Sequence, residues 1–313
     1  MKKLIFAVVL IAVSVLGAMS VFGQKAKSKD DMFKEMAALT KNQKPEDTEK
    51  AYVMAKEFIA RFGSDKDERV PKIKAFADKY REHLFFEAVT AHKYADTFAL
   101  GKEILAVQPD NIDVLLNIAY EGYSSVGPTQ NRMYVDDSIG YAKKAIQLLD
   151  GGGTAKSFAP FKDKDDAEAF MYFVAGNLTF DKDMKEGAAT VYKAVHFEST
   201  VKNASLPYFL IASYYEDVYA KLSTDLKTKV DAKTISDADQ KAALAKITKT
   251  IDLMMDAYAR TVTRAEAEKN PALAGWNQRL VQIYKFEKKT DVGLKEFIVA
   301  ANASPLPDPS AFQ

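Results

Sequence analysis

The sequence predicts an all-α protein built from antiparallel helix hairpins. In segment after segment of the 313 residues, apolar side chains recur at the spacing of one helix face. In addition, Pro271 and Pro305 stand 34 residues apart and bracket two such helices, with a short polar break at 287–291 between them. One hairpin of this size cannot bury its apolar face alone, so further copies are expected.

The chain upstream of residue 110 predicts a polar linker followed by three helices. Basic and acidic residues alternate early in the segment 24–44, which we therefore expect to be a flexible linker. Pro45 precedes and Gly63 stops a helix with one apolar stripe. Two more helices are expected over about 69–86 and 91–107. The stripe of the first helix consists of Ala51, Tyr52, Ala55, Phe58, Ile59 and Phe62.

Two further hairpins are predicted in the middle of the chain, on either side of a glycine run. The first follows Pro109 and holds about seven extra residues between its helices, and the second covers about 167–195. Small residues, among them Ser138, Ala145 and Gly187, are expected to face a neighbouring helix. Gly151 to Gly153 predict a helix stop and a hinge between two helical lobes, because no strand precedes them and no phosphate-binding Lys-Ser/Thr pair follows.

The last part of the chain predicts one irregular and one regular hairpin. A helix over about 206–222 has the pattern of the earlier ones, but its partner, roughly 237–268, is too long for one repeat helix. After Pro271 the two helices are regular, and Gly293 and Ala300 are expected to let their backbones come close. Apolar positions of this last hairpin are Trp276, Leu280, Ile283, Tyr284, Leu294, Phe297, Ile298 and Ala301.

The residues of this last hairpin resemble the tetratricopeptide-repeat (TPR) family: Leu280, Tyr284, Gly293, Phe297 and Ala300 stand between the two prolines where a TPR has its signature residues. The resemblance extends in degenerate form over most of 45–305, in four or five hairpins. At Gly122 the chain departs from the family, which usually has an aromatic residue there. The resemblance implies a TPR-like α-solenoid. The alternative is an unrelated all-α bundle, because apolar residues at helical spacing occur in every packed helix.

The N-terminus predicts export. Lys2 and Lys3 precede an apolar run that begins at Leu4, and small residues flank Phe22 before Gln24. We expect a signal peptide over 1–23 and a periplasmic or secreted protein. The lipoprotein route is excluded, because the sequence has no cysteine to carry the lipid. The alternative is an uncleaved helix anchored in the inner membrane, since the apolar run of about 17 residues is near the lower limit for spanning a bilayer.

These signals divide the chain into six predicted segments. They are the signal peptide 1–23, the linker 24–44, an N-terminal TPR-like lobe 45–150, a glycine-containing linker 151–164, a C-terminal TPR-like lobe 165–305 and a tail 306–313.

Charge and motifs exclude several classes of function. The formal net charge is +1 with both signs mixed along the chain, which gives no basic face for nucleic acid. His83 and Glu87 lie one helical turn apart, but no third metal ligand shares their face. The acidic run 163–166 lacks the glycine and glutamate of a calcium loop and predicts the first turn of a helix instead. No nucleophile, base and orienting residue can be named together, so neither an enzyme nor a bound cofactor is expected.

The TPR resemblance implies a ligand face on the first helix of each repeat. Such a face would be rich in aromatic residues with one cation, which suits an extended peptide or a partner helix. Asp113 and Leu116 stand where a clamp for acidic C-terminal tails would need positive or polar residues. The alternative is that the aromatic residues pack between repeats. The positions implied are Asn117, Tyr120, Tyr123, Tyr172, Phe173, Phe209, Gln278, Arg279 and Gln282.

Together these features predict a non-catalytic protein-interaction scaffold of the bacterial cell envelope that binds a protein or peptide on the concave face of its repeats. The alternative is a periplasmic helical protein that binds peptides or glycans by aromatic stacking.

Overall fold

The computed structural model describes residues 27–311, and the predicted signal peptide lies outside them. The described residues form thirteen α-helices and one short 3-10 helix, with no strand among them. The prediction of an all-α protein is confirmed. Within 27–311, no helix combines the length and the apolar character needed to cross a membrane.

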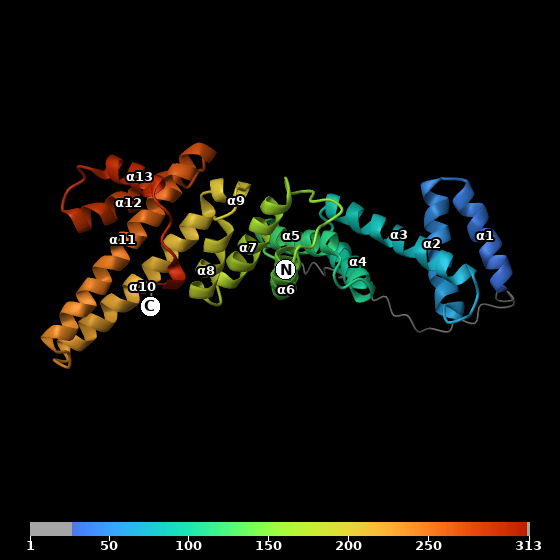
Figure 1. Cartoon of the computed structure of the whole chain (residues 1–313), viewed down its shortest axis with the longest axis horizontal. Helices are drawn as coiled ribbons and strands as arrows, with labels where there is room; N and C mark the ends of the chain where they lie inside the picture. Colours follow the sequence, from blue (N-terminus) through green and yellow to red (C-terminus); the bar gives the residue numbers. More distant parts are fainter. Residues whose placement is uncertain (1–26, 312–313) are drawn as a thin grey trace, which may run out of the picture. The chain divides into compact units, whose positions relative to one another are not determined.

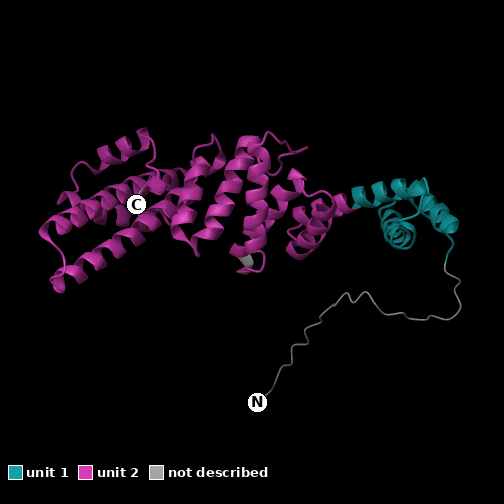
Figure 2. Cartoon of the chain, turned by 60° about the horizontal axis from the view of Figure 1, so that its bottom comes forward, with its two compact units in different colours: residues 1–80 teal, residues 81–313 magenta. Residues whose placement is uncertain are grey.

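Two compact units make up the chain, Met1–Tyr80 and Arg81–Gln313 (Figure 2). The boundary between them falls inside helix α3 (Arg69–Thr90). The glycine-containing segment 151–164 lies within the second unit, and the predicted division into lobes at that segment stays a prediction.

The first unit contains α1 (Lys29–Lys41) and α2 (Pro45–Phe62). Here the structure differs from the sequence prediction, because α1 occupies most of the expected flexible linker 24–44. Ser28 caps α1 by accepting a hydrogen bond from the backbone N–H of Asp31, and Met32 and Met36 are buried one turn apart where α1 contacts α2. The alternating charges of this segment lie on the exposed side of an amphipathic helix, which is why they resembled a linker.

In the second unit, helices that follow one another in the sequence pack as neighbours (Figure 1). The pairs α5 with α6, α7 with α8 and α10 with α11 are in contact, and α6 contacts α7 while α8 contacts α10. The helices of this unit are α4 (Tyr94–Val107), α5 (Ile112–Thr129), α6 (Val135–Asp150), α7 (Lys164–Phe180), α8 (Met184–Ala194), α9 (Thr200–Asn203), α10 (Leu206–Asp231), α11 (Asp237–Glu268), α12 (Leu273–Lys288) and α13 (Leu294–Ala303).

Small residues allow these helices to approach closely. A Cβ atom placed on Gly176 would lie 2.8 Å from the carbonyl oxygen of Gly187, and one placed on Gly187 would lie 2.7 Å from the Cα of Phe180. The α7–α8 crossing therefore brings backbone against backbone. Ser138 and Ala145, which were expected at helix contacts, are buried as well, and so are the small residues Ala119, Ala175 and Ala194.

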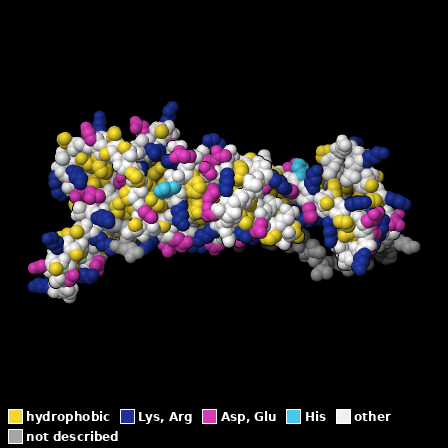
Figure 3. Space-filling model, in the orientation of Figure 1, with side chains coloured by type: hydrophobic (Ala, Val, Ile, Leu, Met, Phe, Trp, Pro, Cys, Tyr) yellow, Lys and Arg dark blue, Asp and Glu magenta, His cyan; other side chains and the backbone are white. Residues whose placement is uncertain are grey.

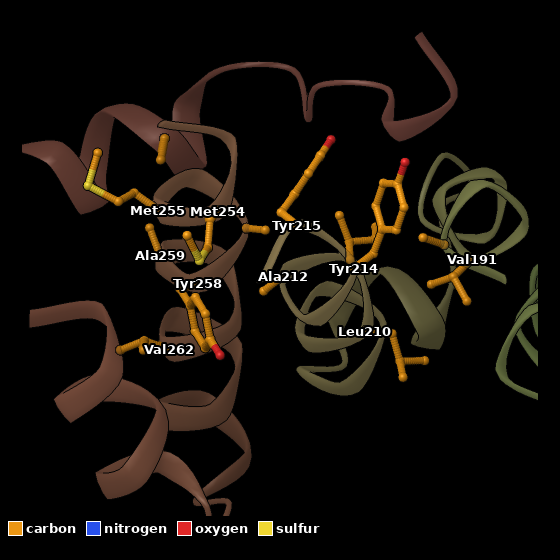
Figure 4. Packing of buried hydrophobic residues seen from close by; sticks show 14 of the residues in the cluster. Val191, Leu210, Ala212, Tyr214, Tyr215, Met254, Met255, Tyr258, Ala259 and Val262 are labelled. Atoms are coloured by element: carbon orange, nitrogen blue, oxygen red, sulfur yellow. The ribbon is translucent and has the colours of Figure 1, made fainter. Parts of the chain in front are cut away.

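A large apolar cluster joins α8, α10 and α11 (Figure 4). Met254 and Met255 of α11 and Tyr215 of α10 are almost completely buried, and Tyr214 of α10 lies toward Val191 of α8. Burial of this much apolar surface is the main stabilising contribution to the second unit.

The final hairpin packs differently from the expectation. Both α12 and α13 contact α11, and the contact between the two helices themselves is smaller, although the rings of Tyr284 and Phe297 lie 5.7 Å apart. Gly293 is needed for its φ of 90° at the N-cap of α13, and Ala300 is exposed. The expectation that Gly293 and Ala300 bring two backbones together is therefore wrong. The long α11 offers a surface on which both short helices bury their apolar faces.

After α13 the chain turns back toward α8. The backbone oxygen of Ser304 accepts a hydrogen bond of 2.9 Å from Nη2 of Arg260, and Leu306 packs against the apolar cluster. The 3-10 helix η1 (Pro309–Ala311) then contacts α8, and Pro309 is buried there (Figure 1). The end of the predicted tail 306–313 is thus a packed element up to Ala311.

Candidate functional site

A pocket of about 620 Å³ lies between the C-terminal half of α3, helix α5 and the loop that follows α6. All three segments belong to the second unit. Its volume falls in the range of about 300–1,000 Å³ typical of ligand sites. Residues from each wall include Glu82 and Phe86 of α3, Asn117, Tyr120 and Glu121 of α5, and Lys156 of the loop.

The loop wall of the pocket is fixed to α5 by a buried aspartate. The two carboxylate oxygens of Asp113 accept hydrogen bonds from the backbone N–H groups of Lys156 (2.9 Å) and Ser157 (2.8 Å). Nδ2 of Asn117, which is also buried, donates to the backbone oxygen of Asp113 at 2.8 Å and approaches that of Ala159 at 3.5 Å. The sequence prediction of a helix stop is confirmed, because α6 ends at Asp150. The loop beyond it is held in place on α5.

A histidine and a buried glutamate in the lining of the pocket contact each other. Nδ1 of His92 lies 3.1 Å and 3.2 Å from the two carboxylate oxygens of Glu121. The Glu121 side chain is 1 % exposed, whereas that of His92 is 61 % exposed. Burial raises the pKa of Glu121, and the hydrogen bond from His92 opposes this shift. The carboxyl group is thus costly to ionise, and His92 is its hydrogen-bond partner.

The backbone at His92 also distinguishes this position. Its φ is 50°, in the left-handed region, and the N–H of the next residue, Lys93, bonds to the carbonyl of Ala88, which closes the C-terminal turn of α3. Glycine is the residue that usually fills this position of a helix end. A histidine there accepts a less favourable backbone conformation, and in exchange its ring reaches Glu121.

The charges of the pocket are unevenly buried. Glu82 at the rim pairs with Lys156 at 3.2 Å, and the Lys156 side chain is 75 % exposed. The deeply buried charged residues of the wall, Asp113 and Glu121, are both acidic. Phe86 and Tyr120 add aromatic surface next to them.

The structure brings two of the residues implied by the TPR resemblance into this pocket, Asn117 and Tyr120. Tyr123 and Phe173 lie next to it in an aromatic cluster, where their ring centroids are 5.5 Å apart and both rings contact Phe170. Phe173 is buried and belongs to the core.

Tyr172 lies in a different environment. Its hydroxyl donates to Oδ2 of Asp150 at 3.3 Å, and its ring stacks on Phe197 at 5.9 Å. Burial and the neighbouring Asp150 raise the pKa of Tyr172 to about 12. Burial and the same Asp150 raise the pKa of Glu168, which is also buried, to about 7. The carboxyl groups of Asp150 and Glu168 thus lie close together at the α6–α7 contact.

The remaining implied residues lie around α12. Nε of Arg279 donates to Oε1 of Glu216 at 2.6 Å, and the hydroxyl of Tyr258 donates to the same oxygen at 3.1 Å. The ring of Phe209 lies 4.9 Å from that of Trp276. Gln278 and Gln282 are exposed on α12. The expected cation of the ligand face is therefore already paired with a carboxylate.

Of the two metal-binding motifs noted in the sequence, His83 and Glu87 form a pair on the surface. Nε2 of His83 lies 3.3 Å from Oε1 of Glu87, and both side chains are exposed. Among residues 27–311, no group of three or more potential metal-ligating side chains comes together. The acidic run 163–166 begins α7, where Asp163 accepts from the N–H of Asp166, as predicted.

Sequence reasoning missed His92 and Glu121 as partners, although part of the signal was readable. Asp113, Asn117 and Glu121 stand at i, i+4 and i+8 of a helix whose first ten residues are otherwise apolar, so they form one polar stripe on a buried element. Buried polar stripes need partners. What the sequence could not supply is that the partners come from a helix end about 29 residues upstream and a loop 43 residues downstream.

No protein-family model, no curated protein and no solved structure matches the chain.

Proposed function

We propose that the protein is a non-catalytic binding module, a TPR-like α-solenoid that holds a segment of a partner protein in the α3–α5 pocket. The order of contacts supports the repeat arrangement. The first helices of successive pairs touch, α5 with α7 and α7 with α10, and each pair also contacts the next. Such nearest-neighbour contacts are the basis of solenoid architectures.

The pocket is the observation on which this proposal depends. It has the volume of a ligand site, its loop wall is fixed by buried hydrogen bonds, and Asn117 and Tyr120 lie in it. A preformed site of this kind loses little conformational entropy when it binds. Elsewhere in the second unit Arg279 is already paired with Glu216 and Phe209 packs on Trp276, so these positions offer a partner less.

From the predicted export signal we further propose that this module lies in the bacterial cell envelope. A scaffold that binds envelope proteins is the main reading. The pocket volume also suits the alternative, a periplasmic protein that binds free peptides or glycans.

A matched pair of threonine variants tests the proposal. Thr90 lines the pocket and Thr228 lies on the outer part of α10, and each exposed threonine donates to the carbonyl four residues earlier, at 2.8 Å and 2.9 Å. Thr90→Trp should fill the mouth of the pocket, whereas Thr228→Trp adds the same side chain away from it. Peptides selected from a random phage-displayed library on the purified full-length protein should bind Thr228→Trp normally and Thr90→Trp at least about tenfold more weakly.

Two results would contradict the proposal. One is equal binding of the selected peptides to both tryptophan variants, which would place the site elsewhere. The other is the absence of any enriched peptide together with binding of oligosaccharides on a glycan array, which would favour the alternative function.

A further inference from the structure

We infer that the α3–α5 pocket takes a cationic group, the guanidinium or ammonium of an arginine or lysine side chain, held against Glu121 between Phe86 and Tyr120. This inference rests on the proposed function and names the chemistry of the bound segment.

The charged residues in the wall of the pocket are mainly acidic. Glu82, Asp113 and Glu121 line the pocket, against Lys156 as the one permanently charged cation among the lining residues. The Asp113 carboxylate needs no ligand as a partner, because two backbone N–H groups already satisfy its oxygens. Lys156 extends into solvent and pairs with Glu82 at the rim. What remains inside is the buried carboxyl group of Glu121.

Glu121 is costly to ionise in the folded protein. A carboxylate that is 1 % exposed loses most of its hydration, and the hydrogen-bond partner that the structure gives it is His92. Burial raises the pKa of this carboxyl group, so ionising it costs the folded state stability. A glutamine of the same shape would not carry this cost. Groups that destabilise a fold in this way concentrate at functional sites.

A ligand cation would relieve this cost of ionising Glu121. A carboxylate can accept several hydrogen bonds, so Glu121 can receive a guanidinium or an ammonium while His92 remains near it. Phe86 and Tyr120 present aromatic surface to the same space, and cations bind favourably over such rings. An anionic group would instead meet the buried carboxylate.

An organic cation fits this pocket better than a bare metal ion does. Hard cations such as Ca²⁺ need six or more oxygen ligands, and no group of three potential ligating side chains comes together in residues 27–311. An organic cation needs fewer charged partners, because its carbon chain contacts apolar surface.

The test uses the full-length protein and short capped peptides of alanine with one central arginine, lysine, glutamine or glutamate. Binding is followed by the NMR signals of the His92 ring, which lies at the pocket. The arginine and lysine peptides should shift these signals and bind at least about tenfold more tightly than the glutamine and glutamate peptides.

Two glutamate variants separate a binding role from a structural one. Glu121→Gln should lower the affinity for the arginine peptide at least about tenfold while leaving the melting temperature equal to or above that of the wild type. Glu87→Gln is the matched control, because Glu87 also pairs with a histidine, His83, but on the surface. It should leave the affinity unchanged.

The outcomes distinguish this inference from the proposed function. If peptides selected from the library lack basic residues but are still excluded by Thr90→Trp, the pocket is a peptide site and the cation inference is wrong. Equal binding of the arginine and glutamine peptides, or full affinity in a folded Glu121→Gln variant, would also overturn it. If no peptide binds at all, the proposed function fails and the inference fails with it.

Discussion

The α7–α8 pair and the outer half of the α10–α11 pair are both helix hairpins, yet they are held in different ways. Where α7 crosses α8, Gly176 and Gly187 bring backbone against backbone, and most of α7 is buried. In the outer half of the α10–α11 pair, from Lys221 to Lys249, no residue is buried. Its apolar residues, such as Leu222 and Ile247, are only half covered.

The difference separates two sources of helix stability. The α7–α8 pair depends on close packing, in which each side chain has one suitable position. The outer hairpin depends on local interactions, among them the ion pairs Asp217–Lys221 (2.6 Å) and Asp225–Lys229 (2.7 Å), four residues apart with the acid first. Mixed charges also cover the face of the molecule shown in Figure 3. Helical periodicity alone therefore indicates that a helix forms without indicating how firmly it is held.

The largest effect should come from adding one methyl group at the α7–α8 crossing. In Gly176→Ala the new Cβ would lie 2.7 Å from Cγ2 of Val191 and 2.8 Å from the carbonyl of Gly187, so the helices must separate. We expect a loss of about 2–3 kcal/mol in the free energy of unfolding, measured by denaturant titration. Gly140→Ala on α6 is the control, since nothing lies within 4 Å of its Cβ position, and it should stabilise by about 0.5–1 kcal/mol. Similar losses for both variants would contradict the close crossing.

A smaller effect is expected at the buried carboxyl group of α7. The folded-state pKa of Glu168 is raised to about 7, above the ordinary value of 4.5, so its contribution to stability is full below about pH 4.5 and is lost as the pH rises through about 7. Glu168→Gln should therefore be more stable than the wild type at about pH 8, by on the order of 2 kcal/mol, and similar to it at about pH 5.

The control for this prediction is Asp225→Asn on the outer hairpin, where the carboxylate is exposed and paired with Lys229. It should change the free energy of unfolding by less than about 0.5 kcal/mol at either pH. Thermal melts of the three proteins across this pH range measure the difference. If the free energy of unfolding of the wild type does not decrease from about pH 5 to about pH 8, Glu168 ionises normally.

The smallest effect should follow a change at the end of the outer hairpin. Leu244 is 49 % exposed, and Leu244→Ala should alter the free energy of unfolding by less than about 0.5 kcal/mol. Hydrogen exchange should also find the amides of 221–249 exchanging faster than those of α7, because the outer turns can open without disturbing a core. Protection equal to that of α7 would mean that another surface covers this hairpin.

Much of the fold could be predicted from local sequence. The long helix expected over about 237–268 agrees with α11, and Pro45 and Gly63 bound α2 as expected. These boundaries depend on residues that act within one turn of where they stand. The same local signals were available for α1, where Ser28, Met32 and Met36 have the spacing of a capped amphipathic helix, but the mixed charges obscured them.

The parts that could not be predicted depend on contacts between distant segments. Nothing local to Ala300 indicates that α13 packs on α11 and leaves this residue exposed. For the candidate site, Asn117 and Tyr120 were among the expected positions because the TPR resemblance implies that they share one helix face. The pairing of His92 with Glu121 could not be predicted, since it requires the turn that ends α3 to lie against α5.

The contact between η1 and α8 changes what kind of folding unit the second unit can be. In an array where each repeat touches only its neighbours, unfolding can start at one end and proceed step by step. Here the chain leaves α8 at Ala194 and returns to it at Pro309, after four further α-helices longer than a single turn. The segment between those points is closed into a loop, so the C-terminal end cannot fray independently while η1 remains in place. Such a closure adds sequence-distant contacts, which slow folding and make the unfolding of this part more cooperative.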